Sequence, residues 1–182
     1  MIREEAMTTT LGATRVPIPL GDAMRLILAE AVRLDGVQAD VVAKGLQDAP
    51  APSAVRRATA CRRAHEILGA VLPYAEQIGE TIEKLRRYEG RLPVRPTAEE
   101  IETSTADLTL WGVVHYLGVA ACEIERSDQV RVECGLQDKP NRDVAALVAA
   151  LDAARDIVEV VATYPKQIAD RLRQLRDRGP RR

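Results

Sequence analysis

The chain repeats itself at a fixed spacing of 90 residues. Residues 16–90 align with residues 106–180 without a gap, and 17 of the 75 aligned positions are identical. Unrelated segments of this composition would share only about 5–6 positions. The densest agreement lies between residues 45–50 (GLQDAP) and residues 135–140 (GLQDKP), which match at five of six positions. The spacing predicts a tandem duplication whose two copies fold alike.

Apolar residues recur at every third or fourth position in both copies, which is typical of amphipathic helices. The first helix is predicted over residues 20–34 and 110–124. A short second helix is predicted over 38–44 and 128–134, although Val130-Arg131-Val132 read alone would suit a strand.

A long third segment, over residues 53–89 and 142–178, has a nearly heptad apolar seam. Pro73 and Pro165 lie near its middle. Because proline removes one backbone hydrogen bond and clashes with the preceding turn, each long helix is predicted to kink or to break there.

The loop shared by residues 45–50 and 135–140 has a structural explanation. Its glycine suits the left-handed residue that ends a helix, and its leucine suits the apolar contact that closes such a cap. Its aspartate can cap the next helix, whose first turn tolerates proline. This interpretation is favoured, while a pair of binding loops is the alternative.

The second copy begins with Thr97-Ala98-Glu99-Glu100, a capping box that predicts a helix from residue 98 to about 125 with fraying at 103–105. The fold class expected is all-α: a tandem-duplicated helical bundle with pseudo-two-fold symmetry and long Pro-bent helices. The organisation predicted along the chain is a flexible N-terminal tail (1–15), helical repeat 1 (16–90), a Pro-containing linker (91–96), helical repeat 2 (97–180) and a C-terminal tail (181–182). The linker is too short for independent tumbling, so one shared bundle is expected.

Three cysteines, an odd number without CxxC spacing, argue against a disulfide framework and a structural zinc site. Cys61 and Cys122 align with apolar residues and are predicted to fill the core, whereas Cys134 is predicted to be exposed beside a turn. The sequence has neither an apolar leader nor an uncharged segment of about 20 residues. A cytoplasmic location without membrane contact is therefore expected.

The repeat argues against a metal or catalytic site. His65 and His115 align with arginines in the other copy and are predicted to be surface bases. Glu80 and Glu83 have the spacing of a magnesium-binding pair, but Arg173 occupies the position equivalent to Glu83. No catalytic, cofactor-binding or metal-binding residue is assigned, and no cofactor is expected.

Two groups of residues are candidates for partner contacts. Tyr74 and Gln77, repeated as Tyr164 and Gln167, lie just beyond the predicted bend and suggest a two-fold surface for a protein partner. The second group is a basic stretch near the C-terminus, which complements the helix dipole, contacts nucleic acid or binds an acidic protein partner: Arg171, Arg173, Arg176 and Arg178.

These observations favour a non-enzymatic cytoplasmic protein-interaction or regulatory helical module. A magnesium-type helical-bundle enzyme and a nucleic-acid-binding protein that uses the Arg-rich C-terminus are the alternatives. The sequence does not identify the protein partner, and homo-oligomerisation is left open.

Overall fold

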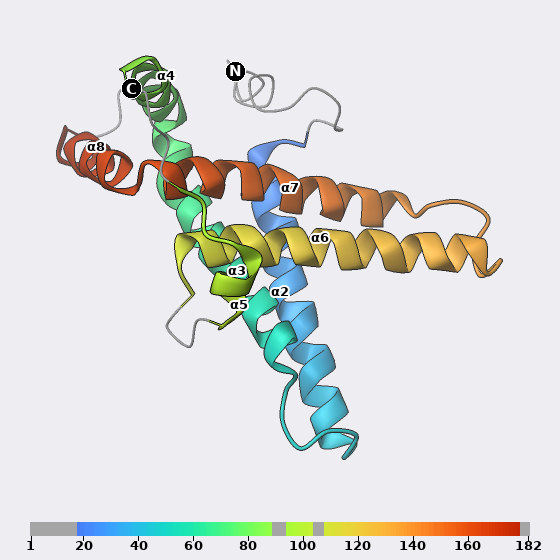
Figure 1. Ribbon diagram of the computed structural model, residues 1–182. Helices are drawn as coiled ribbons and strands as arrows, with labels where there is room; N and C mark the ends of the chain where they lie inside the picture. The colour runs from blue at the N-terminus through green and yellow to red at the C-terminus, as the bar shows by residue number, and fades with distance from the viewer. Residues whose placement is uncertain (1–17, 89–93, 104–107, 179–182) are drawn as a thin grey trace.

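The computed structural model describes residues 18–88, 94–103 and 108–178, and within them it contains helices and connecting segments but no strand (Figure 1). The predicted all-α class is therefore confirmed. The predicted tails, and half of the predicted linker (residues 91–93), lie outside the described residues. The elements are α2 (Leu20–Ala43), α3 (Pro52–Val71), the 3-10 turn η1 (Leu72–Tyr74), α4 (Ala75–Tyr88), α5 (Ala98–Thr103), α6 (Leu110–Glu133), α7 (Arg142–Thr163) and α8 (Pro165–Arg178).

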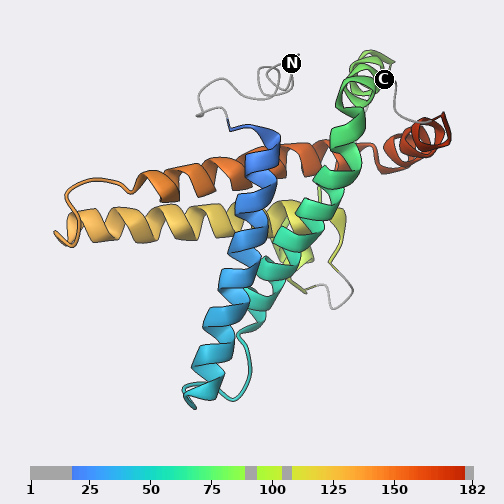
Figure 2. The same cartoon turned by 180° about the vertical axis from the view of Figure 1, so that it is seen from behind.

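Two helical hairpins cross each other (Figures 1 and 2). One is made of α2 and α3 and the other of α6 and α7; α2 packs on α7, and α3 packs on α6. On one side of the crossing, α4 packs against α8. The turn that closes the α2/α3 hairpin lies at the bottom of Figure 1 and the turn that closes the α6/α7 hairpin lies at its right, so the two turns point in different directions, both away from α4 and α8.

Helix ends coincide between the two halves at the sequence offset of 90. Helices α2 and α6 begin at residues 20 and 110 and end at 43 and 133; α4 and α8 cover 75–88 and 165–178. Residues 38–44 and 128–134 are helical almost throughout, as predicted, but they continue α2 and α6 instead of forming separate helices. Shared ancestry and rotational symmetry remain predictions.

Both long segments are interrupted at their prolines. In the first half, Pro73 lies in the 3-10 turn between α3 and α4, whose flanking residues keep right-handed helical backbone angles. In the second half, Tyr164 leaves the helical region at φ −127° and ψ 51°, and Pro165 begins α8. Proline is compatible with a first helical turn because the N–H it lacks would have no partner there. Each predicted bend is therefore a division into two helices.

The capping box at the start of α5 is present. The Glu100 carboxylate accepts the Thr97 N–H at 2.7 Å, and the Thr97 hydroxyl accepts the Glu100 N–H at 3.3 Å. The hydrogen bond from the Thr97 backbone lowers the pKa of Glu100. Helix α5 nevertheless ends at Thr103, and residues 104–107 lie outside the described ranges, so the predicted helix over 98–125 is replaced by α5 and a separate α6.

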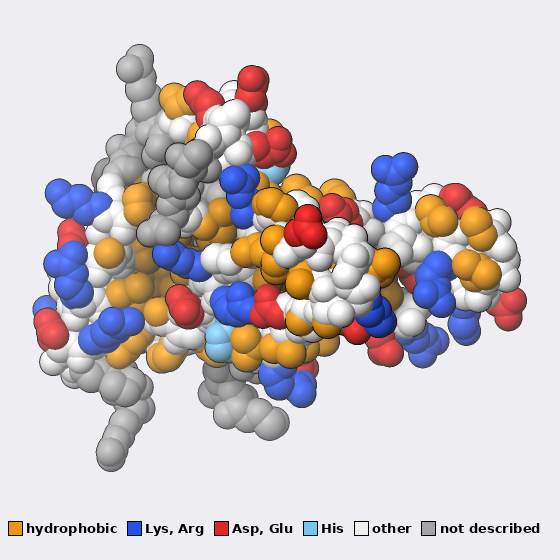
Figure 3. All heavy atoms as spheres, turned by 90° about the horizontal axis from the view of Figure 1, so that it is seen from below, with side chains coloured by type: hydrophobic (Ala, Val, Ile, Leu, Met, Phe, Trp, Pro, Cys, Tyr) orange, Lys and Arg blue, Asp and Glu red, His pale blue; other side chains and the backbone are white. Residues whose placement is uncertain are grey.

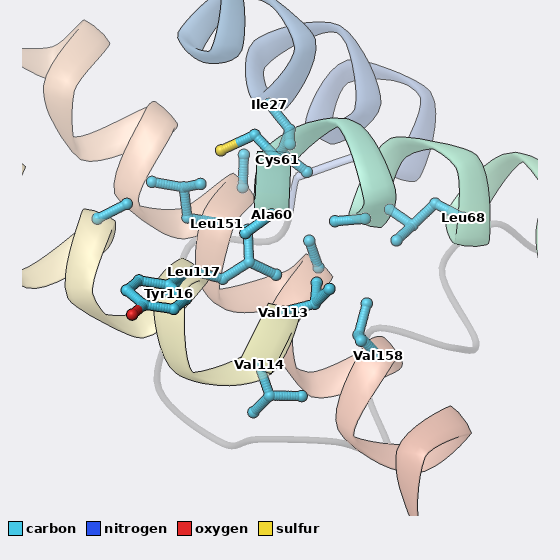
Figure 4. Close-up of a cluster of buried hydrophobic side chains, with 14 of the residues drawn as sticks. Ile27, Ala60, Cys61, Leu68, Val113, Val114, Tyr116, Leu117, Leu151 and Val158 are labelled. Carbon is cyan, nitrogen blue, oxygen red and sulfur yellow. The ribbon is translucent and has the colours of Figure 1, made fainter. Parts of the chain in front are cut away.

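The main core takes side chains from both hairpins (Figure 4). Its large members are interleaved with alanines such as Ala60 and Ala154, which let the crossing helices approach closely. A second, smaller cluster joins α4 to α8 around Ile78 and Ile168. The largest fully buried side chains of the main core are Ile27, Leu68, Val113, Val114, Leu117, Leu151 and Val158.

None of the described helices is both long enough and apolar enough to cross a membrane.

Candidate interaction surface

The two hairpin turns share one backbone geometry. Gly45 and Gly135 have φ of 67° and 69°, in the left-handed region that glycine adopts without steric cost. The Leu46 N–H donates to the Val41 carbonyl at 3.1 Å, and the Leu136 N–H donates to the Arg131 carbonyl at 2.8 Å. Together with bonds from the glycine N–H groups, these close a Schellman cap on each helix. The glycine prediction is confirmed in both copies.

The leucine after each glycine is not buried by the cap. Leu46 and Leu136 are each 71% exposed. An apolar contact within the cap therefore does not explain why leucine occurs at these positions. Backbone hydrogen bonds close the cap, and most of each leucine side chain faces solvent. We call residues 45–50 and 135–140 the hairpin tips. Viewed from below, both tips show hydrophobic side chains (Figure 3).

The aspartates of the tips do not cap the following helices. Helices α3 and α7 begin at Pro52 and Arg142, so their N-cap residues are Ala51 and Asn141. Asn141 caps α7 through its own side chain, which accepts the Asp143 N–H at 2.9 Å, while Ala51 has no side chain that can do so. The predicted capping role is wrong because each helix starts four residues beyond the aspartate, and its N-cap lies three residues beyond. Asp48 and Asp138 are exposed and make no hydrogen bond or ion pair with another described residue.

A polar residue behind each tip fixes the start of the next helix. The Gln38 side chain accepts the Ala51 N–H at 2.7 Å, and the Asp128 carboxylate accepts the Asn141 N–H at 3.0 Å. Gln38 and Asp128 are equivalent positions of the repeat, but their residue types differ. A search for identical residues in the two copies therefore misses this pair, although the polar residue at both positions could have revealed their shared role.

The tyrosines of the predicted partner surface belong to the α4/α8 core. Tyr164 is 2% exposed and Tyr74 is partly buried, and both join the smaller apolar cluster. The helix break at residue 164 precedes α8, which packs on α4, and Tyr164 lies in the apolar cluster between them. Gln77 is half-buried and Gln167 is exposed. The four residues thus do not form one exposed face.

The C-terminal arginines are spread around α8. Arg171 is half-buried and donates to the Gln174 side chain at 3.5 Å, while Arg173 pairs with Asp170 at 3.0 Å. Arg176 and Arg178 are exposed in the last turn, where their charge complements the helix dipole. Arg86 and Arg87 have the same placement at the end of α4. The favourable interaction of these four arginines with the helix dipoles accounts for their positions without a nucleic-acid ligand.

His115 is not the surface base predicted from its position beside Val114. Its side chain is 18% exposed because α5 covers this side of α6, and its Nε2 lies 3.4 Å from a Glu102 carboxylate oxygen. His65 is likewise half-buried.

The candidate magnesium pair, Glu80 and Glu83, is exposed on α4, and Glu83 lies 3.7 Å from Arg86. On α6, Glu123 forms an ion pair with Arg57 of α3. Within the described ranges, no group of three or more His, Cys, Asp and Glu residues is placed to hold a metal ion.

The cysteines divide into one buried thiol and two exposed ones. Cys61 is fully buried, as predicted, and burial together with the negative charge of Glu30 raises its pKa to about 12. Cys134 is exposed, as predicted. Cys122 is exposed instead of buried, and so is the apolar residue at its equivalent position, Val32, which is 64% exposed.

The hairpin tips therefore combine the same hydrogen-bonded glycine turn, an exposed leucine and an exposed carboxylate, and this combination occurs twice. Such a turn places an apolar side chain where a partner can contact it. The chain matches no protein-family model, no curated protein and no solved structure.

Proposed function

We propose that this chain is a non-enzymatic interaction or regulatory module, built by tandem duplication, that binds a protein partner through its two hairpin tips. The observation that carries the proposal is the equal exposure, 71%, of Leu46 and Leu136. This surface takes the place of the Tyr74 and Tyr164 surface favoured by the sequence.

A single exposed leucine is ordinary on a protein surface and needs no explanation. Here the same leucine lies exposed at equivalent positions of two segments that differ at 58 (75 − 17) of their aligned positions. Core packing does not require it, and the glycine before it already supplies the left-handed backbone. We attribute both leucines to a shared contact outside the chain, because burial of an exposed leucine side chain in an interface removes its apolar surface from water.

The surroundings of the tips agree with this role. Five of the eight large apolar side chains that are exposed among the described residues belong to the tips or to the adjacent ends of the hairpin helices. Beside the two leucines these are Val37, Val55 and Val130, which are 44–46% exposed. Each tip thus has an apolar margin that could extend the contact made by its leucine.

The proposed duplication is supported by the packing of the hairpins. Helix α2 corresponds to α6, and α3 corresponds to α7. An operation that exchanges the two halves would therefore turn the contact between α2 and α7 into the contact between α6 and α3. The same operation leaves the contact between α4 and α8 unchanged, because these two helices correspond to each other. Such exchanged contacts are expected of an isologous dimer whose subunits have become joined, and we propose a pseudo-two-fold axis between the hairpins.

The test is a pair of substitutions at the tips, Leu46→Ser with Leu136→Ser, in the full chain. Quantitative mass spectrometry of affinity-purified material from the source cells should find a protein that accompanies the unaltered chain and is lost from the double variant. Val32→Ser is the matched control, because it removes an exposed apolar side chain outside the tips. Equal recovery with the double variant and the unaltered chain would refute the proposal. Thermal unfolding should show that the double variant is folded.

A further inference from the structure

The segment between the two hairpins packs on α6 through α5. We call residues 94–103 the strap. We infer that its helical end, α5, is a pH-sensitive cover, which is held on α6 when His115 is protonated and is released more readily when His115 is neutral. The inference concerns this conformational change alone, and it holds or fails independently of the hairpin tips.

The first end of the strap is held by charges that do not change near neutral pH. The Arg95 guanidinium lies 5.5 Å from the centre of the Trp111 ring of α6 and 3.1 Å from a carboxylate oxygen of Glu159 on α7. Carboxylates titrate near about pH 4 and guanidinium groups above about pH 12. This end of the strap should therefore stay attached between pH 5 and 8.

Helix α5, at the other end, is held by fewer contacts. Ile101 is partly buried against the main core, and the remaining residues of α5 are exposed. A helix of six residues is not stable by itself, so its order depends on the helices beneath it. Arg56 of α3 donates a hydrogen bond of 3.1 Å to the Glu102 backbone carbonyl, and the Glu102 carboxylate approaches His115.

The contact between Glu102 and His115 depends on the charge of the imidazole. The Nε2 atom of His115 is shielded from solvent, lies 3.4 Å from Glu102 Oε1 and makes no hydrogen bond with another described residue. Their attraction therefore rests on opposite charges. Histidine side chains gain a proton as the pH falls from about 8 to 5, whereas carboxylates stay ionised. Protonation of His115 should thus hold α5 on α6, and loss of the proton should weaken that contact.

The other charged groups near His115 keep their charge over this range. Residues 108–122, which include the surrounding turns of α6, contain no Asp, Glu, Lys or Arg. From α3, Arg56 also donates to the Tyr116 hydroxyl at 2.8 Å, and its positive charge opposes protonation of His115 equally at every pH between 5 and 8. From α7, Arg155 lies one turn along α6 from His115 and is paired with two aspartates of its own helix. The change between pH 5 and 8 is therefore assigned to the imidazole.

The expected change is modest, because one partner of the pair is open to solvent. The Glu102 side chain is 61% exposed and that of His115 is 18% exposed. An ion pair with a largely exposed partner shifts such an equilibrium by about 2–5-fold. Raising the pH should therefore increase the fraction of molecules in which α5 has left His115, while Arg95 keeps the strap attached to α6.

The experiment measures hydrogen exchange of the full chain by mass spectrometry with millisecond labelling at pH 5.5, 6.5 and 8. Each rate is divided by the rate of an unstructured peptide at the same pH. Protection of the amides of residues 101–103 should fall by about 2–5-fold from pH 5.5 to 8, while the central turns of α3 and α6 keep theirs. Glu102→Gln and His115→Gln should each abolish this fall, because each removes one charge of the pair. His65→Gln is the matched control, since it replaces the other histidine of the chain and should leave the fall intact.

Three results would overturn the inference: constant protection of residues 101–103 in the unaltered chain, a fall that persists in Glu102→Gln, and an equal fall in α6, which would place the effect of pH on the whole fold. Glu102→Gln changes an exposed side chain and keeps the carbonyl that Arg56 binds, so it tests the pair even if His115→Gln does not fold. Because the experiment contains no partner, its failure would leave the proposed function intact.

Discussion

Arg33 binds both carboxylate oxygens of Glu30, with Nε 2.6 Å from Oε2 and Nη2 2.7 Å from Oε1. Glu30 is 2% exposed on α2, whereas the guanidinium lies near the surface with a side-chain exposure of 55%. The hydrogen bonds to Glu30 raise the pKa of Arg33. Ala120 stands at the equivalent position of the other half, so this buried charge belongs to only one copy.

Arg33→Ala should destabilise the protein, because it leaves the Glu30 carboxylate buried without its partner. We expect a loss of about 1–3 kcal/mol in the free energy of unfolding, measured by urea denaturation. The double variant Glu30→Ala, Arg33→Ala copies the alanine of the other half at position 30 and should recover much of that loss. Equal stability of the single and double variants would contradict this account.

Two of the three thiols should react readily in the folded protein. Cys122 and Cys134 are exposed, while Cys61 is buried and its pKa of about 12 leaves almost no thiolate near neutral pH. Titration with a thiol reagent should therefore modify two cysteines before unfolding and the third only in denaturant. The variant Cys122→Ser, Cys134→Ser should be silent until it unfolds; rapid labelling of that variant would show that the core opens.

The same thiol should make stability fall with rising pH. Its folded pKa of about 12 exceeds its ordinary value of 9.0, so the unfolded chain releases this proton at a lower pH than the folded chain. The stabilisation is complete below pH 9 and is lost between pH 9 and 12, by up to about 1.4 kcal/mol per pH unit. Urea denaturation at pH 8 to 11 should show a shallower decline in Cys61→Ala than in the unaltered chain.

Glycine substitutions should have opposite effects at the tips and in the helix before them. Gly45→Ala or Gly135→Ala forces alanine into left-handed backbone and should cost about 1 kcal/mol. Gly36→Ala should stabilise by about 0.5–1 kcal/mol, because residue 36 lies inside α2 and its added Cβ has open space. Chemical denaturation of the three variants shows whether the free energy of unfolding rises or falls. A lower free energy of unfolding in Gly36→Ala would contradict the placement of residue 36 inside α2.

The two glutamines of the tips should differ in importance. Gln137 donates to the Asp128 carboxylate at 2.6 Å and to its carbonyl at 3.2 Å, whereas Gln47 is exposed without a hydrogen bond to another described residue. Gln137→Ala should therefore cost about 1–2 kcal/mol, and Gln47→Ala less than about 0.5 kcal/mol. Equal losses in denaturation midpoints would refute this asymmetry.

Local structure could be predicted from the sequence wherever one strong signal determines it. Apolar spacing predicts helix across α2 and α6, glycine predicts the left-handed end of each helix, and proline predicts each interruption of the long segments. Thr97 and Glu100 predict the start of α5 correctly, because a capping box depends only on neighbouring residues.

Exposure was harder to predict, because it depends on which elements cover a surface. His115 is half-buried under α5, which the sequence could not place there. Cys122 was assigned to the core from the apolar character of Val32, yet Val32 lies on the surface. Tyr164 was assigned to a partner surface, but the packing of α8 on α4 buries it. An apolar residue in one copy therefore does not establish that the equivalent position of the other copy is buried.

Because the main core joins both hairpins, the order of synthesis has a consequence for the cell. The hairpin of α2 and α3 leaves the ribosome first, and the apolar side chains that α6 and α7 will cover, among them Ile27 and Leu68, are then still exposed to water. Until translation supplies the second hairpin, the nascent chain resembles half of a dissociated dimer. Chaperones should therefore meet this protein chiefly during that interval of its synthesis.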